Sequence, residues 1–273
     1  MSVFHYEEEY KIAQEQENLL TDISTRCILV LIMDAITDLT PRQIQILKAV
    51  IDEYIATAEA VGSETLEKKH NLGVSPATIR NEMVRLTELG MLKQPHTSAG
   101  RTPTPVAMKY YVEQLMKPKD LSVAEEVAVK EKVWNYRQEI DKLLREATKA
   151  LAEKTKALAI TATNEGDLYY AGAANILDMP EFYDYQLTHE LLGTLDEYAF
   201  WWHVLESHDD LSSILLGDDL STGMLTQCGF VYHKFKTPHV SGAIGVVGPS
   251  RLNYSAVIPV VRYLGNLIDE FAS

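Results

Sequence analysis

The stretch "LGVSPATIRNEMVRLTELG" (residues 72–90) predicts a helix with an unusual outer face. Ser75 is suited to cap its N-terminus, Pro76 to occupy the first helical position, and Gly90 to end it. Apolar residues recur every three or four positions and form the inner face. On the outer face and its flanks lie side chains that could contact nucleic acid: Ala77, Thr78, Arg80, Asn81, Val84 and Arg85.

These residue types match the edges of base pairs in the DNA major groove. Arginine pairs with guanine through two hydrogen bonds, asparagine pairs with adenine, and small apolar groups contact the thymine methyl. The free N–H groups at the start of the helix are suited to hold a phosphate. Taken alone, the helix fits an ordinary solvated amphipathic helix equally well. The surrounding elements therefore decide the interpretation.

Two helices and a hairpin surround this stretch. "TDLTPRQ" opens a helix near residue 41, with Thr40 as cap and Gln43 completing a capping box, and a short helix follows over 63–70. After the quoted stretch, "MLKQPHTSAGRTPTP" predicts a hairpin in which Gly100 supplies the unusual backbone angles, and a helix is expected over 106–116. This order is that of a winged helix-turn-helix, the pattern that moves the interpretation toward DNA.

The hairpin adds residues that would contact the sugar–phosphate backbone or enter the adjacent minor groove, with Arg101 expected near the tip. The predicted DNA-binding residues are Ser75, Ala77, Thr78, Arg80, Asn81, Val84, Arg85, Lys93, His96, Thr97, Ser98, Arg101 and Thr102. No catalytic, cofactor-binding or metal-binding residues are predicted.

The chain divides into four predicted parts. Residues 1–38 form an N-terminal extension, 39–116 the winged helix, 117–157 a linker and one long helix, and 158–273 an α+β domain. In the last part we expect strands or strand-to-helix edges at "ALAIT" and "LYYAGAANIL", and strands at "GFVYHKF" and "VSGAIGVVG". One amphipathic helix is expected over 185–206 and a final helix over 254–271.

Composition indicates a globular protein of a reducing, cytoplasmic compartment. The 273 residues are 46% hydrophobic and 23% charged, and the two cysteines have no metal-ligand spacing. No run is long enough to span a bilayer. The net charge of −14 argues against a general nucleic-acid binder, but residues 39–116 hold nine basic and eight acidic residues, so the remainder carries −15. This uneven distribution of charge fits a single specific surface in residues 39–116 that contacts an anionic partner.

Several motifs that would indicate an enzyme or a metal site are incomplete. The glycines at 242, 245 and 248 do not have the spacing of a dinucleotide-binding loop, and "HELLG" at 189–193 lacks the second histidine of a zinc protease. No nucleophile-elbow motif is present. Trp201 and Trp202 are expected in the core or an interface. The sequence therefore predicts no enzyme and no cofactor.

Long stretches of the sequence resemble the HrcA family of heat-inducible transcription repressors. "GVSPATIRNEMVRLTELGMLKQPHTSAGRTPT" is similar to its DNA-binding domain, and "LTPRQIQILKAVIDEYIATAEAVGSETL" to its first two helices. In the second half, "AGAANILDMPEF" and "GAIGVVGPSRLNYSAVIPVVRYL" are similar to two further family stretches. The resemblance implies a GAF-like fold for 158–273 and a homodimer on an inverted-repeat operator of chaperone operons. It also implies release on heat stress and folding assisted by a GroE-type chaperonin.

The sequence departs from the family in two places. Only "AITATNEGDLYY" joins the helix near 143–158 to the "AGAANIL" stretch, where the family has a long region with an inserted dimerisation domain. The long helix and the Trp201–Trp202 region are therefore candidate dimer contacts. Residues 1–38 have no recognised counterpart, and translation from Met33 is one hypothesis, which native peptides from before Met33 would exclude. An open alternative is a ligand- or protein-binding sensor that uses the winged helix for protein contact.

Overall fold

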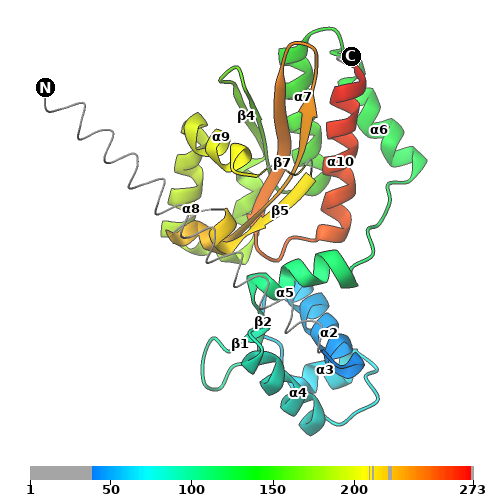
Figure 1. Cartoon of the computed structure of the whole chain (residues 1–273), viewed down its shortest axis with the longest axis vertical. Coiled ribbons are helices and arrows are strands. Elements are labelled where there is room, and N and C mark those ends of the chain that lie inside the picture. The colour runs from blue at the N-terminus through cyan, green and yellow to red at the C-terminus, as the bar shows by residue number, and fades with distance from the viewer. Residues whose placement is uncertain (1–38, 209, 211, 221–222, 272–273) are drawn as a thin grey trace, which may run out of the picture.

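The computed structural model describes residues 39–208, 210, 212–220 and 223–271. The expectations for the N-terminal extension, including Cys27 and Met33, lie outside these residues. Within them, a winged-helix unit is followed by a larger unit in which helices cover both faces of a sheet (Figure 1).

The first unit has the predicted order of elements. Helices α2 (Pro41–Thr57), α3 (Ser63–Lys69) and α4 (Pro76–Glu88) precede the antiparallel pair β1 (Leu92–Lys93) and β2 (Thr102–Pro103). Helix α5 (Pro105–Tyr110) continues into a π-helical turn, η1 (Tyr111–Leu115). The predicted capping box is present, because Thr40 accepts from the Gln43 amide and the Gln43 side chain accepts from the Thr40 amide.

The single long helix expected from residue 123 to 155 is wrong, because the chain reverses within it. Helix α6 (Val123–Trp134) and helix α7 (Ile140–Thr155) pack side by side and are joined by a turn over 135–139. Ion pairs Lys132–Glu153 and Lys154–Glu125 run between the two helices. The turn lets Val129 and Val133 of α6 share one core with the apolar face of α7, which a continuous helix projecting from the domain could not do.

A five-stranded antiparallel sheet forms the centre of the second unit. Its order is β4 (Leu168–Ala171), β3 (Leu158–Thr163), β7 (Ser241–Pro249), β6 (Cys228–Lys236) and β5 (Ser212–Leu216). The strands predicted at 157–161, 229–235 and 240–248 are present as β3, β6 and β7, and β5 is an edge strand that the sequence analysis did not predict.

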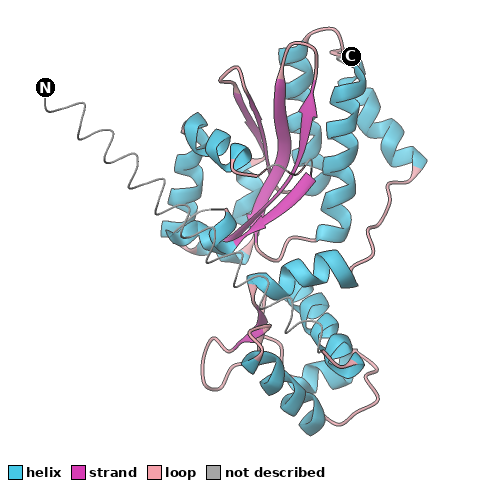
Figure 2. Ribbon diagram, in the orientation of Figure 1, coloured by secondary structure: helices cyan, strands magenta, loops and turns pink. Residues whose placement is uncertain are grey.

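Helices cover both faces of this sheet (Figure 2). On one face pack α7 and α10 (Tyr254–Phe271), and on the other α8 (Tyr185–Gly193) and α9 (Tyr198–Glu206). The single helix expected over 185–206 is wrong, because the 3₁₀ turn η4 (Thr194–Asp196) interrupts it. Other short 3₁₀ segments are η2 (Ala173–Asp178), η3 (Pro180–Tyr183), η5 (Gly217–Asp219) and η6 (Gly223–Gln227). This arrangement agrees with the expected GAF-like α+β fold.

The interruption fixes the place of Trp201. Its indole N–H donates to the Thr194 carbonyl oxygen at 3.0 Å, and only 1% of the residue is exposed. Trp202 is half-buried and stacks on Tyr198. Of the two places expected for Trp201, the core or an interface, the structure shows the core. Trp201 is therefore not available for contact with a partner.

The two units meet along α5 and the C-terminal end of α2. Lys109 of α5 forms an ion pair with Asp219, and the Arg251 guanidinium donates to the Ile55 carbonyl oxygen at 3.2 Å. These two contacts fasten the winged helix to the sheet domain. Figure 1 shows α5 at the junction of the two units.

Candidate nucleic-acid interface

Helix α4 turns the predicted contact residues outward. Ile79, Met83 and Leu86 are buried against the other helices of the winged helix. On the opposite side, Thr78 is half-buried and the other predicted residues of the helix are exposed: Ala77, Arg80, Asn81, Val84 and Arg85. The predicted amphipathic arrangement of this helix is therefore confirmed, while its contact with DNA stays a prediction.

The start of α4 is held by side chains from the same predicted set. Ser75 Oγ accepts from the Thr78 amide at 3.3 Å and lies 3.0 Å from Thr78 Oγ1. The cap predicted from the sequence is therefore present, and it fixes the end of the helix whose dipole favours an anion such as a phosphate. Arg85, on the flank, donates to Glu82 Oε1 at 3.4 Å.

The loop of the hairpin is organised by a residue that the sequence analysis did not select. The Gln94 side-chain amide donates to the carbonyl oxygens of Thr97 and Ala99, at 2.9 and 3.1 Å. These bonds hold the loop that carries the exposed candidates His96, Thr97 and Ser98, directly after the exposed Lys93 at the end of β1. An amide at the start of a hairpin loop is the signal that could have identified it.

Arg101 lies away from the hairpin tip. Its backbone N–H and carbonyl pair with Val61, each at 2.9 Å, and its Nε donates to Thr87 Oγ1 at 3.1 Å. The residue therefore fastens the wing to the end of α4 and to the connection between α2 and α3. Thr102, the next candidate, is only 7% exposed and lies inside the wing.

Gly100 is required for a different reason from the predicted one. The φ angle of Gly100 is not positive, so its backbone conformation does not itself require glycine. A Cβ atom at this position would lie 2.3 Å from the Val61 carbonyl oxygen, so any side chain would push the two backbones apart. The glycine therefore permits the close approach of the wing to the helical part of the domain.

Helix and wing together form one groove. It is lined from α4 by Arg80, Met83 and Val84, and from the wing by Gln94, Thr97 and Ser98, among others. The candidate base-contacting residues and the candidate backbone-contacting residues therefore share a continuous surface. That continuity is what a helix in the major groove with a flanking wing requires.

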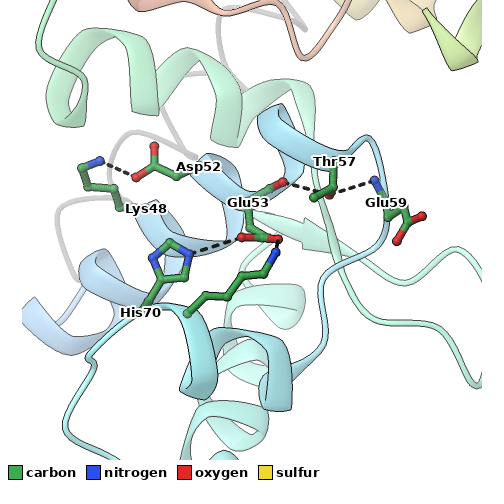
Figure 3. A network of polar contacts seen from close by, with 7 residues as sticks. Lys48, Asp52, Glu53, Thr57, Glu59 and His70 are labelled. Atoms are coloured by element: carbon green, nitrogen blue, oxygen red, sulfur yellow. Dashed lines mark hydrogen bonds and ion pairs between the residues drawn. The ribbon is translucent and has the colours of Figure 1, made fainter.

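Glu53 of α2 connects the helices that support α4. It is 7% exposed, forms an ion pair with Lys69, and its Oε2 lies 3.6 Å from His70 Nε2 (Figure 3). The hydrogen bond from Lys69 is the main cause that holds the pKa of Glu53 below its ordinary value. Since α3 packs directly on α4, this network helps to place the candidate DNA-contacting helix.

We expect Glu53→Gln to lower the melting temperature near neutral pH by about 2–4 °C, because it removes a charged partner of Lys69. A lowered pKa in the folded state adds stability above the ordinary value of 4.5 and loses it as the pH falls through the lowered pKa. The difference from the unsubstituted protein should therefore shrink below pH 4.5, as followed by circular dichroism. The matched control is Glu59→Gln, at an exposed position. A difference that persists unchanged in acid would contradict this electrostatic origin.

Two family descriptions match the chain and together cover most of it. The HrcA protein C-terminal domain matches residues 101–258, and the winged helix-turn-helix transcription repressor domain, HrcA DNA-binding, matches residues 38–116. The chain belongs to the HrcA family. It is thus a member of a family of transcription repressors, which is not an enzyme family. The HrcA winged helix includes all thirteen predicted contact residues.

Curated relatives support the same assignment over different lengths. The heat-inducible transcription repressor HrcA of Symbiobacterium thermophilum is 50% identical over 105 residues, which are 38% of this chain and 31% of that protein. The HrcA repressor of Ruminiclostridium cellulolyticum is 28% identical over 337 aligned positions, covering 85% of this chain and 97% of that protein. The aligned part of this chain, 85% of 273 residues, is far shorter than the 337 positions of the alignment. Roughly a hundred residues of that relative therefore stand opposite gaps in this chain.

A solved structure confirms the fold of this HrcA chain. The crystal structure of a hypothetical protein superposes with a TM-score of 0.68 at 18% identity, covering 86% of this chain and 98% of the other. Among the described residues there is no group of three or more potential metal ligands. In that same part of the chain, no helix is both long and apolar enough to cross a membrane.

Proposed function

We propose that this HrcA chain represses chaperone operons in the cytoplasm by binding an inverted-repeat operator as a dimer, and that heat stress releases it. A GroE-type chaperonin is the proposed folding partner. The observation that carries the proposal is the exposed face of α4, where a guanidinium, a carboxamide and two small apolar side chains lie together. This face supports base reading in the major groove, and favours DNA over a protein-contact role for the winged helix.

Different residues are assigned different parts of recognition. Arg80 and Asn81 would read base edges through paired hydrogen bonds, while Ala77 and Val84 would contact thymine methyl groups. Lys93 of the wing would contact phosphates and set the position of the protein on the duplex. The acidic remainder of the chain repels DNA elsewhere, so that only one surface is favourable.

The test is an electrophoretic mobility shift with the family's inverted-repeat operator and a scrambled duplex of equal composition. We expect Arg80→Ala and Asn81→Ala each to weaken operator binding by about 1–3 kcal/mol and to reduce the preference over the scrambled duplex. Lys93→Ala should weaken binding to both duplexes alike and lower the salt dependence, because it releases fewer counterions.

The matched control is Arg42→Ala, which removes one exposed arginine from α2 outside the α4 face. Thermal unfolding of every variant should stay within a few degrees of the parent protein. Equal affinity of parent, Arg80→Ala and Asn81→Ala for the operator would overturn the assignment of the reading residues. Equal weak binding of the parent to both duplexes would overturn the proposed function.

A further inference from the structure

A cavity of about 600 Å³ lies between the winged helix and the sheet domain. Its walls come from α5 and η1 on one side, and from β5, β6 and α10 on the other. Figure 1 shows α5 next to β5, where the two units meet. The volume falls within the range of about 300–1,000 Å³ in which proteins hold small organic ligands. The proposed function uses none of these walls.

Much of the wall is apolar. Ile258 and Val261 of α10 are buried, as is Val231 of β6, while Val112 of η1 and Ile214 of β5 are half-buried. These five side chains converge from both units of the chain. They therefore offer a surface on which apolar side chains of a ligand can leave water.

Charged groups of both signs stand beside this apolar wall. Arg262 of α10 and Glu113 of η1 are exposed, and neither forms an ion pair within the described part of the chain. Asp210 adds a second exposed carboxylate. Lys109 also lines the cavity, but its ammonium group is already paired with Asp219. A ligand with one positive and one negative group therefore matches the charges that remain.

Strand β5 has a free backbone edge. In an antiparallel strand, the N–H and C=O of one residue point to the same side, and successive residues alternate. The Leu216 N–H donates at 3.4 Å to Asp219 Oδ2, which lies in η5 and not on β6. The Ser250 N–H donates to the Gln227 carbonyl oxygen at 3.0 Å, directly before β6. Carried through the register of the sheet, this bond gives the same alternation, so Ile214 also turns its N–H and C=O away from β6.

The winged helix closes the neighbouring part of this edge. At Gly217, directly after β5, an added Cβ atom would lie 3.2 Å from Cγ of Pro105 at the start of α5. The Leu216 N–H is already occupied by Asp219. Ile214 lines the cavity, so its two backbone groups face the open part of the edge.

The wall that η1 contributes is fixed from behind. The Tyr111 hydroxyl donates to Asp52 Oδ1 of α2 at 2.7 Å, which holds η1 against the winged helix. The next two residues, Val112 and Glu113, line the cavity. A π-helical turn such as η1 is rare and is frequent at functional sites. The cavity is therefore formed before any ligand binds, which lowers the entropic cost of binding.

We propose that this cavity binds a short free peptide, which adds to the edge of β5 in an extended conformation. The central residue of the peptide exchanges N–H···O=C hydrogen bonds with Ile214, and its apolar side chains pack on the wall. Its carboxylate binds Arg262 and its ammonium group lies beside Glu113. A short free peptide carries all of these features together, and the addition of a strand to an exposed edge is a recurring mode of peptide recognition. The inference goes beyond the proposed function and needs no DNA.

The first test is isothermal titration calorimetry of the full chain with a peptide of three valines that has both ends free. Valine favours the extended conformation and supplies apolar side chains. We expect saturable binding, weakened about tenfold when the central amide of the peptide is N-methylated, because the Ile214 carbonyl then loses its donor. Absence of binding at about 1 mM peptide, or equal binding of the methylated peptide, would overturn the proposal.

A second test removes the partner group from the protein. Ile214→Pro deletes the outward N–H and takes no bond from the ladder with β6, and edge strands accept proline in this orientation. We expect peptide binding to weaken at least tenfold, while the matched control Ile214→Val binds like the parent. Thermal unfolding establishes that each variant is folded. If Ile214→Pro does not fold, the methylated peptide and the unsubstituted protein still decide the question.

A third test concerns the charged ends. Arg262→Gln should weaken binding of the free peptide severalfold and leave binding of a peptide with an amidated C-terminus unchanged, since the carboxylate is then absent. The matched control is Arg145→Gln, at an exposed arginine of α7 outside the cavity. Equal binding of the free peptide and of one blocked at both ends would show that the cavity takes any extended segment, and would overturn the assignment to free peptides. Failure of operator binding leaves all three results unaffected.

Discussion

Arg251→Ala is expected to lower the free energy of unfolding by about 2–4 kcal/mol and to loosen the winged helix from the sheet domain. The Arg251 guanidinium binds Glu181 through two bonds, Nε to Oε1 at 2.5 Å and Nη2 to Oε2 at 2.9 Å. Its third donor group reaches the Ile55 carbonyl oxygen at the C-terminal end of α2, at 3.2 Å. One side chain thus joins three segments of the chain.

The size of the effect follows from burial. The side chains of Arg251 and Glu181 are 15% and 19% exposed, so water does little to replace a lost partner. Removing one member of a well-buried pair leaves the other charge uncompensated and costs about 3–5 kcal/mol, and partial exposure here reduces that figure. The loss of the bond to Ile55 adds to it at the junction between the two units.

Differential scanning calorimetry measures both consequences. We expect a lower midpoint and a separation of the winged-helix transition from that of the sheet domain. Lys149→Ala is the control, because its exposed pair with Glu146 within α7 should contribute less than about 0.5 kcal/mol. In a double-mutant cycle, Glu181→Gln should add little once Arg251 is alanine. A single unchanged transition for Arg251→Ala would contradict the coupling.

This pair also explains why part of the structure was not predictable. Glu181 lies in "AGAANILDMPEF" and Arg251 in "GAIGVVGPSRLNYSAVIPVVRYL", the two stretches by which the second half resembles HrcA. Neither stretch has a periodicity that requires the other as its partner, because 70 residues separate the two side chains. Only the fold of the sheet domain brings them together, beside the end of α2.

The winged helix was predictable because its signals are local. A cap, a proline at the first helical position and an apolar stripe each act within a few residues, and all agree over α2 and α4. The sequence predicted one helix over 123–155 and one over 185–206, and the structure has two helices in each range. The turns that interrupt them contain no proline and have no distinct loop composition. There the burial of both helices in one core decides the path of the chain, and no local residue reports it.

In the candidate site, too, some features follow from the local sequence and others depend on contacts between distant segments. The outward face of α4 follows from helical spacing and is where the sequence placed it. The position of Arg101 does not follow from local spacing, because it depends on contacts with Val61 and Thr87, which are distant in sequence. Gly100 was correctly selected, but the reason is again a contact with Val61 and not a turn conformation. Long-range approach of the backbone is the information that a single sequence lacks.

A close approach of the backbone also makes Gly265→Ala strongly destabilising, with an expected loss of about 3 kcal/mol in the free energy of unfolding. Gly265 lies in the middle of α10, where it faces β6 of the central sheet. A Cβ atom added there would lie 2.1 Å from Cδ2 and 2.8 Å from Cγ of the His233 ring. Two side-chain groups cannot occupy this space, so the helix or the ring must move.

The ring has little freedom to do so. His233 is 3% exposed on β6, and its Nε2 lies 3.1 Å from Asn266 Oδ1 of the same helix. Displacing the ring would break that bond, and displacing α10 would open the core shared with α7 and the sheet. The strain therefore exceeds the stability that alanine ordinarily adds to a helix in place of glycine.

Thermal unfolding of Gly265→Ala should show a midpoint lower by roughly 6–12 °C. Gly193→Ala is the matched control, because Gly193 is also helical, at the end of α8, and a Cβ atom there would meet no atom within 4 Å. This second variant should be neutral or slightly more stable, since alanine reduces the freedom of the unfolded chain. If both variants unfold like the parent, the contact between α10 and His233 does not limit the packing of this sheet domain. If only Gly265→Ala is destabilised, the cause is the close approach of helix and sheet and not the loss of a glycine from a helix.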